Sequence, residues 1–252
     1  MKRDSEETAV TDIDRRRMLK TAASIGAALM VAPLASAQEQ AESVQIRAAA
    51  FAQEHQPKPL PFDSSSLNGL SQRLIDSHWS NNYSGSVRAL NETKRRLSDA
   101  LADRDLPAYI YNDLKREHLM RTGSVVLHEL YFDNLGGNGR ADSAAQRLLS
   151  AGFGDFGRWE AEFRRIANGL GGGSGWVVLG YNAQFGTLEN YWMADHMHNP
   201  AATVPLLVMD MYEHSYHIDF GSAAGQYVDA FFSNINWEQV LARMEALRLS
   251  AA

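Results

Sequence analysis

Residues 204–214 read VPLLVMDMYEH, and this segment is the clearest indication of how the chain folds. Its apolar residues at two-residue spacing predict a short strand over Val204 to Tyr212. Asp210 shares a face with apolar residues of that strand, so its carboxylate is expected to enter the interior where the strand ends. A buried carboxylate without a partner is costly. His214 follows four residues later, just beyond the strand.

Two more short strands are predicted before this one, over Trp176 to Tyr181 and Thr187 to Met193. The loop 182–186 between them ends in glycine and has the length of a hairpin connection, so a small antiparallel sheet is expected. Helical spacing predicts helices near this sheet, two before it and two after it, and these should pack on it: Ser143 to Ser150, Phe156 to Asn168, Tyr227 to Phe232 and Trp237 to Leu247.

Two helices are predicted nearer the N-terminus, and each directs one histidine into the core. Ser65 or Ser66 can cap the first, whose apolar residues recur every three or four positions and continue to His78. The second runs from about Pro107 to Leu135 and carries His128 on its apolar face. The predicted fold class is therefore α+β: an N-terminal helical hairpin followed by a C-terminal domain with a three-stranded antiparallel sheet and helices.

The chain is predicted to divide into four parts. Residues 1–37 are an export signal, 38–56 a linker, 57–138 the N-terminal helical domain and 139–252 a C-terminal α/β metal-binding domain. The run GGNG at 136–139 is expected to be a flexible hinge between the last two parts.

The predicted signal has the features of a leader for export. RRRMLK at 15–20 precedes a weakly apolar run that ends at Leu34, and ASA at 35–37 is a small-residue cleavage pattern. The run is too short to stay in a bilayer as a spanning helix. The paired arginines and the Ala- and Gly-diluted run resemble twin-arginine signals, which serve proteins exported already folded. We expect a periplasmic or secreted protein with no stable membrane insertion after signal removal; an ordinary secretory signal or a membrane anchor is the alternative.

Composition excludes several classes of protein. The 252 residues include 24 Lys and Arg against 30 Asp and Glu, for a net charge of −6, and 45% are hydrophobic, which excludes a disordered chain. An acidic protein of this kind is not expected to bind nucleic acid. Cysteine is absent, so disulfides, thiolate metal sites and cysteine nucleophiles are excluded, and any metal must be held by histidine and carboxylate.

Four side chains could form such a metal site: His78, His128, Asp210 and His214. Neutral imidazoles and one carboxylate suit iron, manganese or zinc, and they leave a position for water or substrate. The Asp-x-x-x-His spacing alone is weak evidence, because a lone histidine on an apolar helix face is more often a core residue. Spacing therefore leaves both interpretations open.

Local sequences are more specific than spacing. DMYEHSY at 210–216 resembles the Asp-x-Trp-Glu-His-Ala-Tyr segment of the iron and manganese superoxide dismutase family, and GSGW at 173–176 and NWE at 236–238 are similar to two further segments of that family. His78 and His128 fall where the family's first and second helices each carry a ligand. The resemblance covers nearly all of the chain beyond the predicted signal and linker.

The resemblance implies one Fe or Mn ion per subunit, held by the four candidate ligands, with solvent in the fifth position. It also implies that superoxide is disproportionated to dioxygen and hydrogen peroxide by alternate reduction and oxidation of that ion. His196 takes the catalytic role of hydrogen bonding to the bound solvent, and His198 is the competing candidate. The same ligands serve both metals, so iron and manganese both stay open.

The resemblance further implies a homodimer or homotetramer. In the family's dimer a glutamate meets a ligand histidine of the other subunit, which here would join Glu213 to His214. A solvated surface carboxylate is the alternative for Glu213.

Several positions depart from the family. Ser86 stands where the family has its gate tyrosine, Asn82 where it has the neighbouring outer histidine, and His217 where it has the interface tyrosine. Tyr212 replaces the tryptophan beside the metal, and Ala224-Gly225 replaces the Arg-Pro near the substrate funnel. Loss of the arginine should slow capture of an anion by an acidic protein. Tyr83 could supply a phenol from the adjacent turn, or it could be a packing residue.

Two functions are therefore compatible with the sequence. The first is a superoxide dismutase, which the complete ligand set favours. The second is a non-dismutase metal-binding relative that keeps the ligand cage but has lost the substrate gate, which the missing arginine and tyrosine favour.

Overall fold

The structure, a computed structural model, describes residues 46 and 48–251. The predicted signal and the predicted linker up to residue 45 lie outside the described residues. The described residues all belong to one compact unit. The division of this unit into two domains between residues 138 and 139 stays a prediction.

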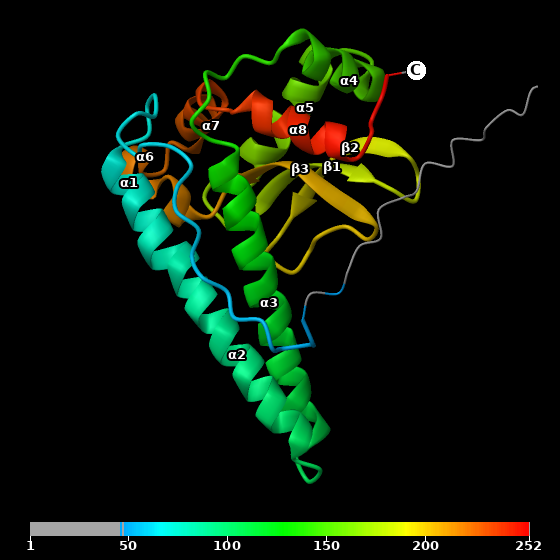
Figure 1. The fold of residues 1–252 in the computed structure, drawn as a ribbon. Coiled ribbons are helices and arrows are strands. Elements are labelled where there is room, and N and C mark those ends of the chain that lie inside the picture. The colour runs from blue at the N-terminus through cyan, green and yellow to red at the C-terminus, as the bar shows by residue number, and fades with distance from the viewer. Residues whose placement is uncertain (1–45, 47, 252) are drawn as a thin grey trace, which may run out of the picture. The chain divides into compact units, whose positions relative to one another are not determined.

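A long helical hairpin forms the first part of the fold (Figure 1). Its first arm consists of α1 (Gln72–Ser77), the π-helix η1 (His78–Tyr83) and α2 (Ser84–Ala102), which follow one another without a break. The second arm is α3 (Ala108–Asp133), which packs along α2. The predicted second helix is thereby confirmed within two residues at each end.

The first helix begins later than the predicted cap at Ser65 or Ser66. Asp63 Oδ1 accepts hydrogen bonds from both N (2.9 Å) and Oγ (2.7 Å) of Ser65, so this part of the chain is held as a turn. Ser71 is the actual N-cap, and its Oγ accepts from Leu74 N at 3.1 Å. The prediction was wrong because several serines compete for the cap, and local sequence does not rank them.

The sheet has the predicted three antiparallel strands: β1 (Trp176–Asn182), β2 (Thr187–Met193) and β3 (Thr203–Asp210), in the order β2-β1-β3. Trp176 at the start of β1 pairs with Asp210 at the end of β3. β1 lies between its neighbours and is almost entirely buried, which explains its continuous run of apolar residues.

Helices flank the sheet in the chain on both sides (Figure 1). Outside the hairpin, α4 (Ser143–Phe153) and α5 (Phe156–Gly169) precede the sheet. The 3₁₀-helix η2 (Glu213–Ser215), α6 (His217–Phe220), α7 (Ala224–Ser233) and α8 (Trp237–Ala246) follow it. α3 and α8 both contact β3. The contact between α3 and β3 brings the end of the hairpin to the end of the last strand.

The segment 136–139, which was predicted to be a flexible hinge, is packed closely against the turn before α8. Gly137 N donates to Asn234 O (3.0 Å), and Gly139 N donates to Ile235 O (3.1 Å). A Cβ atom at Gly137 would overlap the carbonyl oxygen of Ile235. We therefore attribute these glycines to close backbone approach rather than to a hinge.

Candidate metal centre

His78 is brought into the core by the change from α1 to η1. It is the first residue of the π-helix and is completely buried. Its ring packs edge-on against Phe132 of α3, with 5.1 Å between ring centroids. A π-turn of this kind inside an α-helix is frequently found at a functional site, because the extra residue re-aims a side chain.

His128 lies on α3, one turn beyond Ser124, and is also buried. Its Nδ1 donates to the carbonyl oxygen of Ser124 at 2.7 Å. That hydrogen bond places the proton of a neutral ring on Nδ1 and leaves the lone pair of Nε2 directed into the core. Nε2 has no hydrogen-bond partner among the described residues. A buried acceptor without a hydrogen-bond partner, beside two other imidazoles and a carboxylate, has the chemistry of a metal ligand.

Asp210 is the last residue of β3, and its side chain is completely buried. Its Oδ1 accepts from Tyr212 N at 2.8 Å, which turns the chain out of the strand. Its carbonyl oxygen accepts from Tyr227 Oη (2.7 Å) and Ser215 Oγ (2.9 Å). These bonds hold the carboxylate so that Oδ2 faces the histidines.

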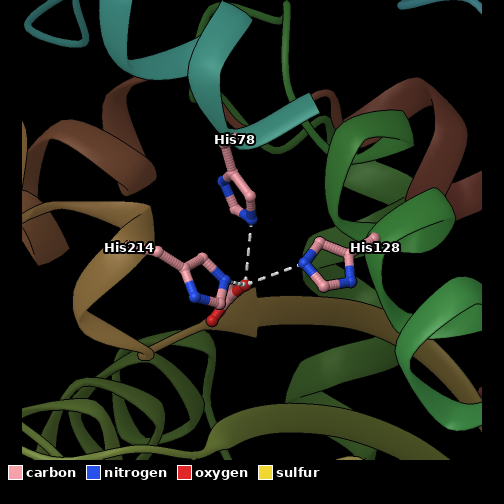
Figure 2. A group of neighbouring side chains, drawn as sticks. His78, His128 and His214 are labelled. Atoms are coloured by element: carbon pink, nitrogen blue, oxygen red, sulfur yellow. Dashed lines mark hydrogen bonds and ion pairs between the residues drawn. The ribbon is translucent and has the colours of Figure 1, made fainter. Parts of the chain in front are cut away.

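The four predicted ligands converge, as Figure 2 shows for the three histidines. Asp210 Oδ2 lies 3.1 Å from His78 Nε2, 3.2 Å from His214 Nε2 and 3.6 Å from His128 Nε2. The candidate donor atoms all lie within 4.8 Å of one another. Three imidazole nitrogens and one carboxylate oxygen at these separations fit a single transition-metal ion.

The protonation states of the centre also suit a metal. Burial alone would raise the pKa of Asp210, but the charge of His214 and the hydrogen bonds from His214 and His78 hold that pKa well below its usual range. Burial lowers the pKa of His78, although Asp210 opposes this effect. Burial and the neighbouring His78 lower the pKa of His128 to about 3. These shifts favour an ionised Asp210 and neutral His78 and His128, the forms that bind metals.

His196 lies beside the centre, in the loop after β2. Its Nδ1 accepts from Trp176 Nε1 at 2.9 Å, and its ring stacks on Tyr212 with 4.7 Å between centroids. The ring centroid lies 5.9 Å from that of His128. The competing candidate, His198, bonds instead to Asp195 through Nδ1 (2.8 Å), and its side chain is 53% exposed.

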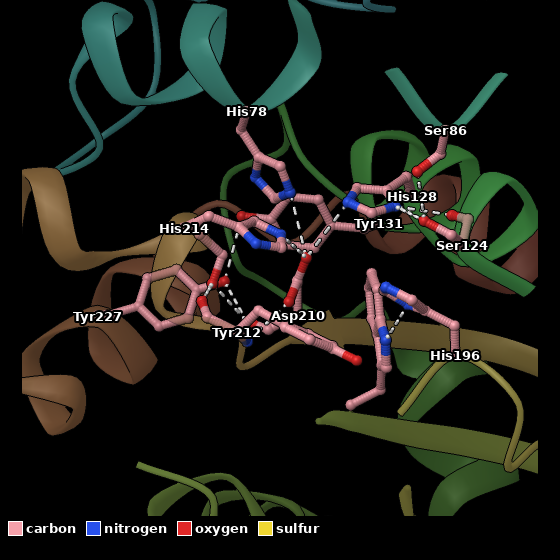
Figure 3. A network of polar contacts seen from close by, with 12 residues as sticks. His78, Ser86, Ser124, His128, Tyr131, His196, Asp210, Tyr212, His214 and Tyr227 are labelled. Carbon is pink, nitrogen blue, oxygen red and sulfur yellow. Dashed lines mark hydrogen bonds and ion pairs between the residues drawn. The ribbon is translucent and has the colours of Figure 1, made fainter. Parts of the chain in front are cut away.

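A pair of serine hydroxyls that local sequence did not predict lies on the far side of His128 (Figure 3). Ser86 Oγ and Ser124 Oγ are 2.8 Å apart and buried, and Ser124 Oγ is 3.3 Å from His128 Nδ1. The position of Ser124, four residues before a candidate ligand on one helix face, is the signal that could have identified it.

Tyr83 is a packing residue, which was one of the two alternatives for it. Its hydroxyl accepts from Lys58 N (2.8 Å) and donates to Glu129 Oε1 (3.0 Å), and Lys58 forms an ion pair with Glu129. Trp79 Nε1 donates to the carbonyl oxygen of Lys58 at 2.9 Å. The phenol therefore fastens the N-terminal segment to the hairpin.

The fold and the centre together define a class: an α+β protein whose helical hairpin and sheet edge enclose a mononuclear three-histidine, one-aspartate metal site. The model of the C-terminal domain of iron/manganese superoxide dismutases matches residues 141–243. The iron superoxide dismutase of Cupriavidus metallidurans is 46% identical over 195 residues, which is 76% of this chain and 97% of that relative. The iron superoxide dismutase of Aquifex pyrophilus is 35% identical, over 71% of this chain and 86% of that relative. The manganese superoxide dismutase of Mycolicibacterium smegmatis is 32% identical, over 70% and 86%.

The chain belongs to the iron/manganese superoxide dismutase family. The resemblance found in the sequence and the predicted α+β fold are both confirmed. Among the described residues, no helix combines the length and the apolar character needed to cross a bilayer.

Proposed function

We propose that the protein is a superoxide dismutase, which converts superoxide to dioxygen and hydrogen peroxide at one Fe or Mn ion. The observation that carries the proposal is the convergence of three imidazoles on Asp210 Oδ2, with His128 Nε2 left unpartnered. The chain is similar to both iron and manganese superoxide dismutases, which supports iron or manganese, rather than zinc, as the bound metal.

The protein's own contribution follows from the contacts of the centre. His78, His128, Asp210 and His214 would hold the ion, which when bound supplies one-electron redox chemistry. Burial lowers the pKa of His196, so its ring is neutral, and the hydrogen bond from Trp176 to Nδ1 leaves its proton on Nε2. His196 can therefore donate a hydrogen bond from Nε2 to solvent or to a small oxyanion beside the ion.

The test is a direct dismutation assay on separately iron-loaded and manganese-loaded protein. We expect one bound ion per subunit and activity with at least one of the metals. Protein that holds stoichiometric metal yet is inactive with both would instead be the metal-binding relative without dismutase activity. The complete ligand set and the dismutase relatives do not favour that alternative.

The ligand assignment has its own test. His128→Ala should abolish stoichiometric metal binding, because it removes one donor and leaves a buried carboxylate with one partner fewer. Metal analysis after reconstitution measures this directly. Full metal content in that variant would refute the assignment.

We also propose that the protein is exported folded through a twin-arginine route to the periplasm or beyond. The support is the sequence RRRMLK followed by a weakly apolar run and ASA at 35–37. Replacing Arg15 and Arg16 together with lysine should leave the precursor in the cytoplasm, which cell fractionation detects. Unchanged export would refute this route.

A homodimer or homotetramer is proposed on the position of Glu213 directly before the candidate ligand His214. His214 is 26% exposed, so a partner subunit can reach its ring. Light scattering on the wild-type protein and on Glu213→Gln tests the proposal. We expect the substitution to shift the wild-type oligomer toward monomer.

A further inference from the structure

An anionic substrate meets an unfavourable charge distribution in this protein. The whole chain carries a net charge of −6. The carboxylate of Asp195 lies in the same loop as His196 and is bound to Met197 N (2.7 Å) and to His198. Ala224, at the start of α7, is buried and brings no charge. If superoxide is the substrate, as proposed above, a cationic side chain elsewhere near the centre should offset the net negative charge and the carboxylate of Asp195.

One face of α3 carries a partly exposed arginine, a buried hydroxyl and a candidate ligand in succession. Arg121, Ser124 and His128 occupy positions i, i+3 and i+7, so they share that face. Seven residues correspond to a rise of about 10 Å along a helix. Ser124 lies between the arginine and the candidate ligand on this face, and its Oγ is 2.8 Å from Ser86 Oγ. Figure 3 shows the two serines on the same side of the centre as His196.

The loop that carries His196 docks on this same part of α3. A Cβ atom at Gly123 would overlap the carbonyl oxygen of His196, so the loop backbone touches the helix two residues from Arg121.

Arg121 is partly exposed and forms an ion pair with Glu117. Its side chain is 36% exposed, and Nε bonds to Glu117 Oε1 at 2.6 Å, one turn further from the centre. Glu117 is eleven residues from His128 and Arg121 is seven, so the carboxylate of this ion pair belongs to the helical turn further from the centre.

We propose that Arg121 attracts superoxide to the metal centre along this face of α3, and that Glu117 orients its guanidinium while weakening its field. The inference rests on the proposed function for its substrate. It assigns the entrance to the side of the centre formed by α3, the serine pair and the loop of His196.

Two substitutions with opposite expected effects test this proposal. Arg121→Gln should lower kcat/KM by about two- to fivefold at low ionic strength, because it removes one positive charge near the entrance. Glu117→Gln should raise kcat/KM, because it removes the neighbouring negative charge and leaves the arginine. Both differences should shrink at high ionic strength, where the Debye length is only a few ångströms.

Arg96→Gln is the matched control. Arg96 also pairs with a glutamate four residues earlier, since its Nε lies 2.6 Å from Glu92 Oε1, but it lies ten residues beyond Ser86 on α2. Arg96→Gln therefore removes one positive charge and one ion pair of the same kind, but further along the hairpin from the metal centre. A loss of kcat/KM equal to that of Arg121→Gln would overturn the proposal, as would a parallel decrease in Arg121→Gln and Glu117→Gln.

Azide binding to the iron(III)-loaded protein supplies a readout that does not depend on activity. Arg121→Gln should weaken azide and Glu117→Gln should strengthen it in an optical titration, with metal content unchanged in both. Equal azide affinity in all variants would overturn the proposal. A wild-type protein without dismutase activity would refute the proposed function alone, because the azide titration would still measure the field of Arg121.

Discussion

Gly123 shows how one residue without a side chain can position a functional group. It lies inside α3, where glycine is unfavourable relative to alanine, and no cap or turn requires it there. Its role is to let the backbone of the loop that carries His196 approach the helix. The same approach brings His196 within reach of Trp176 Nε1.

Gly123→Ala is therefore expected to displace the loop and to weaken the bond between Trp176 and His196. Overpacking of this kind destabilises proteins by about 1–3 kcal/mol. Metal content should stay stoichiometric, because Gly123 contributes no ligand. The Trp176 indole N–H resonance of the metal-free protein and thermal unfolding measure the two effects.

Gly85→Ala on α2 is the matched control, since a Cβ atom there would meet only Arg88 Nη2 at 3.8 Å. It should leave the Trp176 resonance in place and slightly increase stability, as alanine does in a helix. An unmoved resonance in Gly123→Ala would show that the loop is positioned by other contacts.

The elements are joined around Asn134, which is the C-cap of α3. Its Nδ2 donates to Val208 O of β3 at 2.9 Å, and its Oδ1 accepts from Arg243 of α8 at 2.6 Å. Its carbonyl oxygen accepts from Asn236 N at 2.7 Å. One buried amide thus connects the hairpin, the sheet and the last helix, close to the strand that ends at Asp210.

Asn134→Ala should destabilise the protein by about 2–4 kcal/mol, because it removes the hydrogen bond to the Val208 carbonyl and one of the partners of the mostly buried Arg243 guanidinium, which keeps Leu206 O and Asp133. Chemical denaturation measures the free energy of unfolding. Asn81→Ala is a suitable control, since Asn81 is exposed and, among the described residues, its side chain bonds to Ser77 Oγ of its own helical arm, at 3.2 Å. Equal, small losses in both variants would contradict a connecting role for Asn134.

For the whole molecule, the metal centre is a cross-link among four elements. Its candidate ligands come from η1, α3, the end of β3 and η2. A bound ion stabilises the native state by mass action, by about 4 kcal/mol when free ligand exceeds its dissociation constant a thousandfold.

Removal of the metal with a chelator should therefore lower the melting temperature, and added Fe or Mn should restore it. Calorimetry on the same sample before and after chelation measures the change. His128→Ala should show no metal-dependent shift. A melting temperature unaffected by metal in the wild-type protein would contradict a cross-link of this kind.

Local sequence was informative wherever short-range periodicity controls structure. The three strands, α3, α4 and α5 were predicted within a few residues, because alternation and helical spacing reflect which face is buried. Ser71 was missed as a cap, and the packing of residues 136–139 was mistaken for a hinge. Each depends on a contact with a part of the chain far along the sequence.

The four ligand candidates were identifiable before the fold was known only because their flanking segments resemble a family; their spacing alone left a core interpretation open. The contact between His78 and Asp210 spans 132 residues, and no local pattern encodes such a distance. The serine pair, the tautomers of His128 and His196, and the approach of Arg121 to the loop all appear only in the folded chain. Side-chain chemistry and short-range order reside in the sequence, whereas the direction and separation of functional groups depend on how distant elements pack.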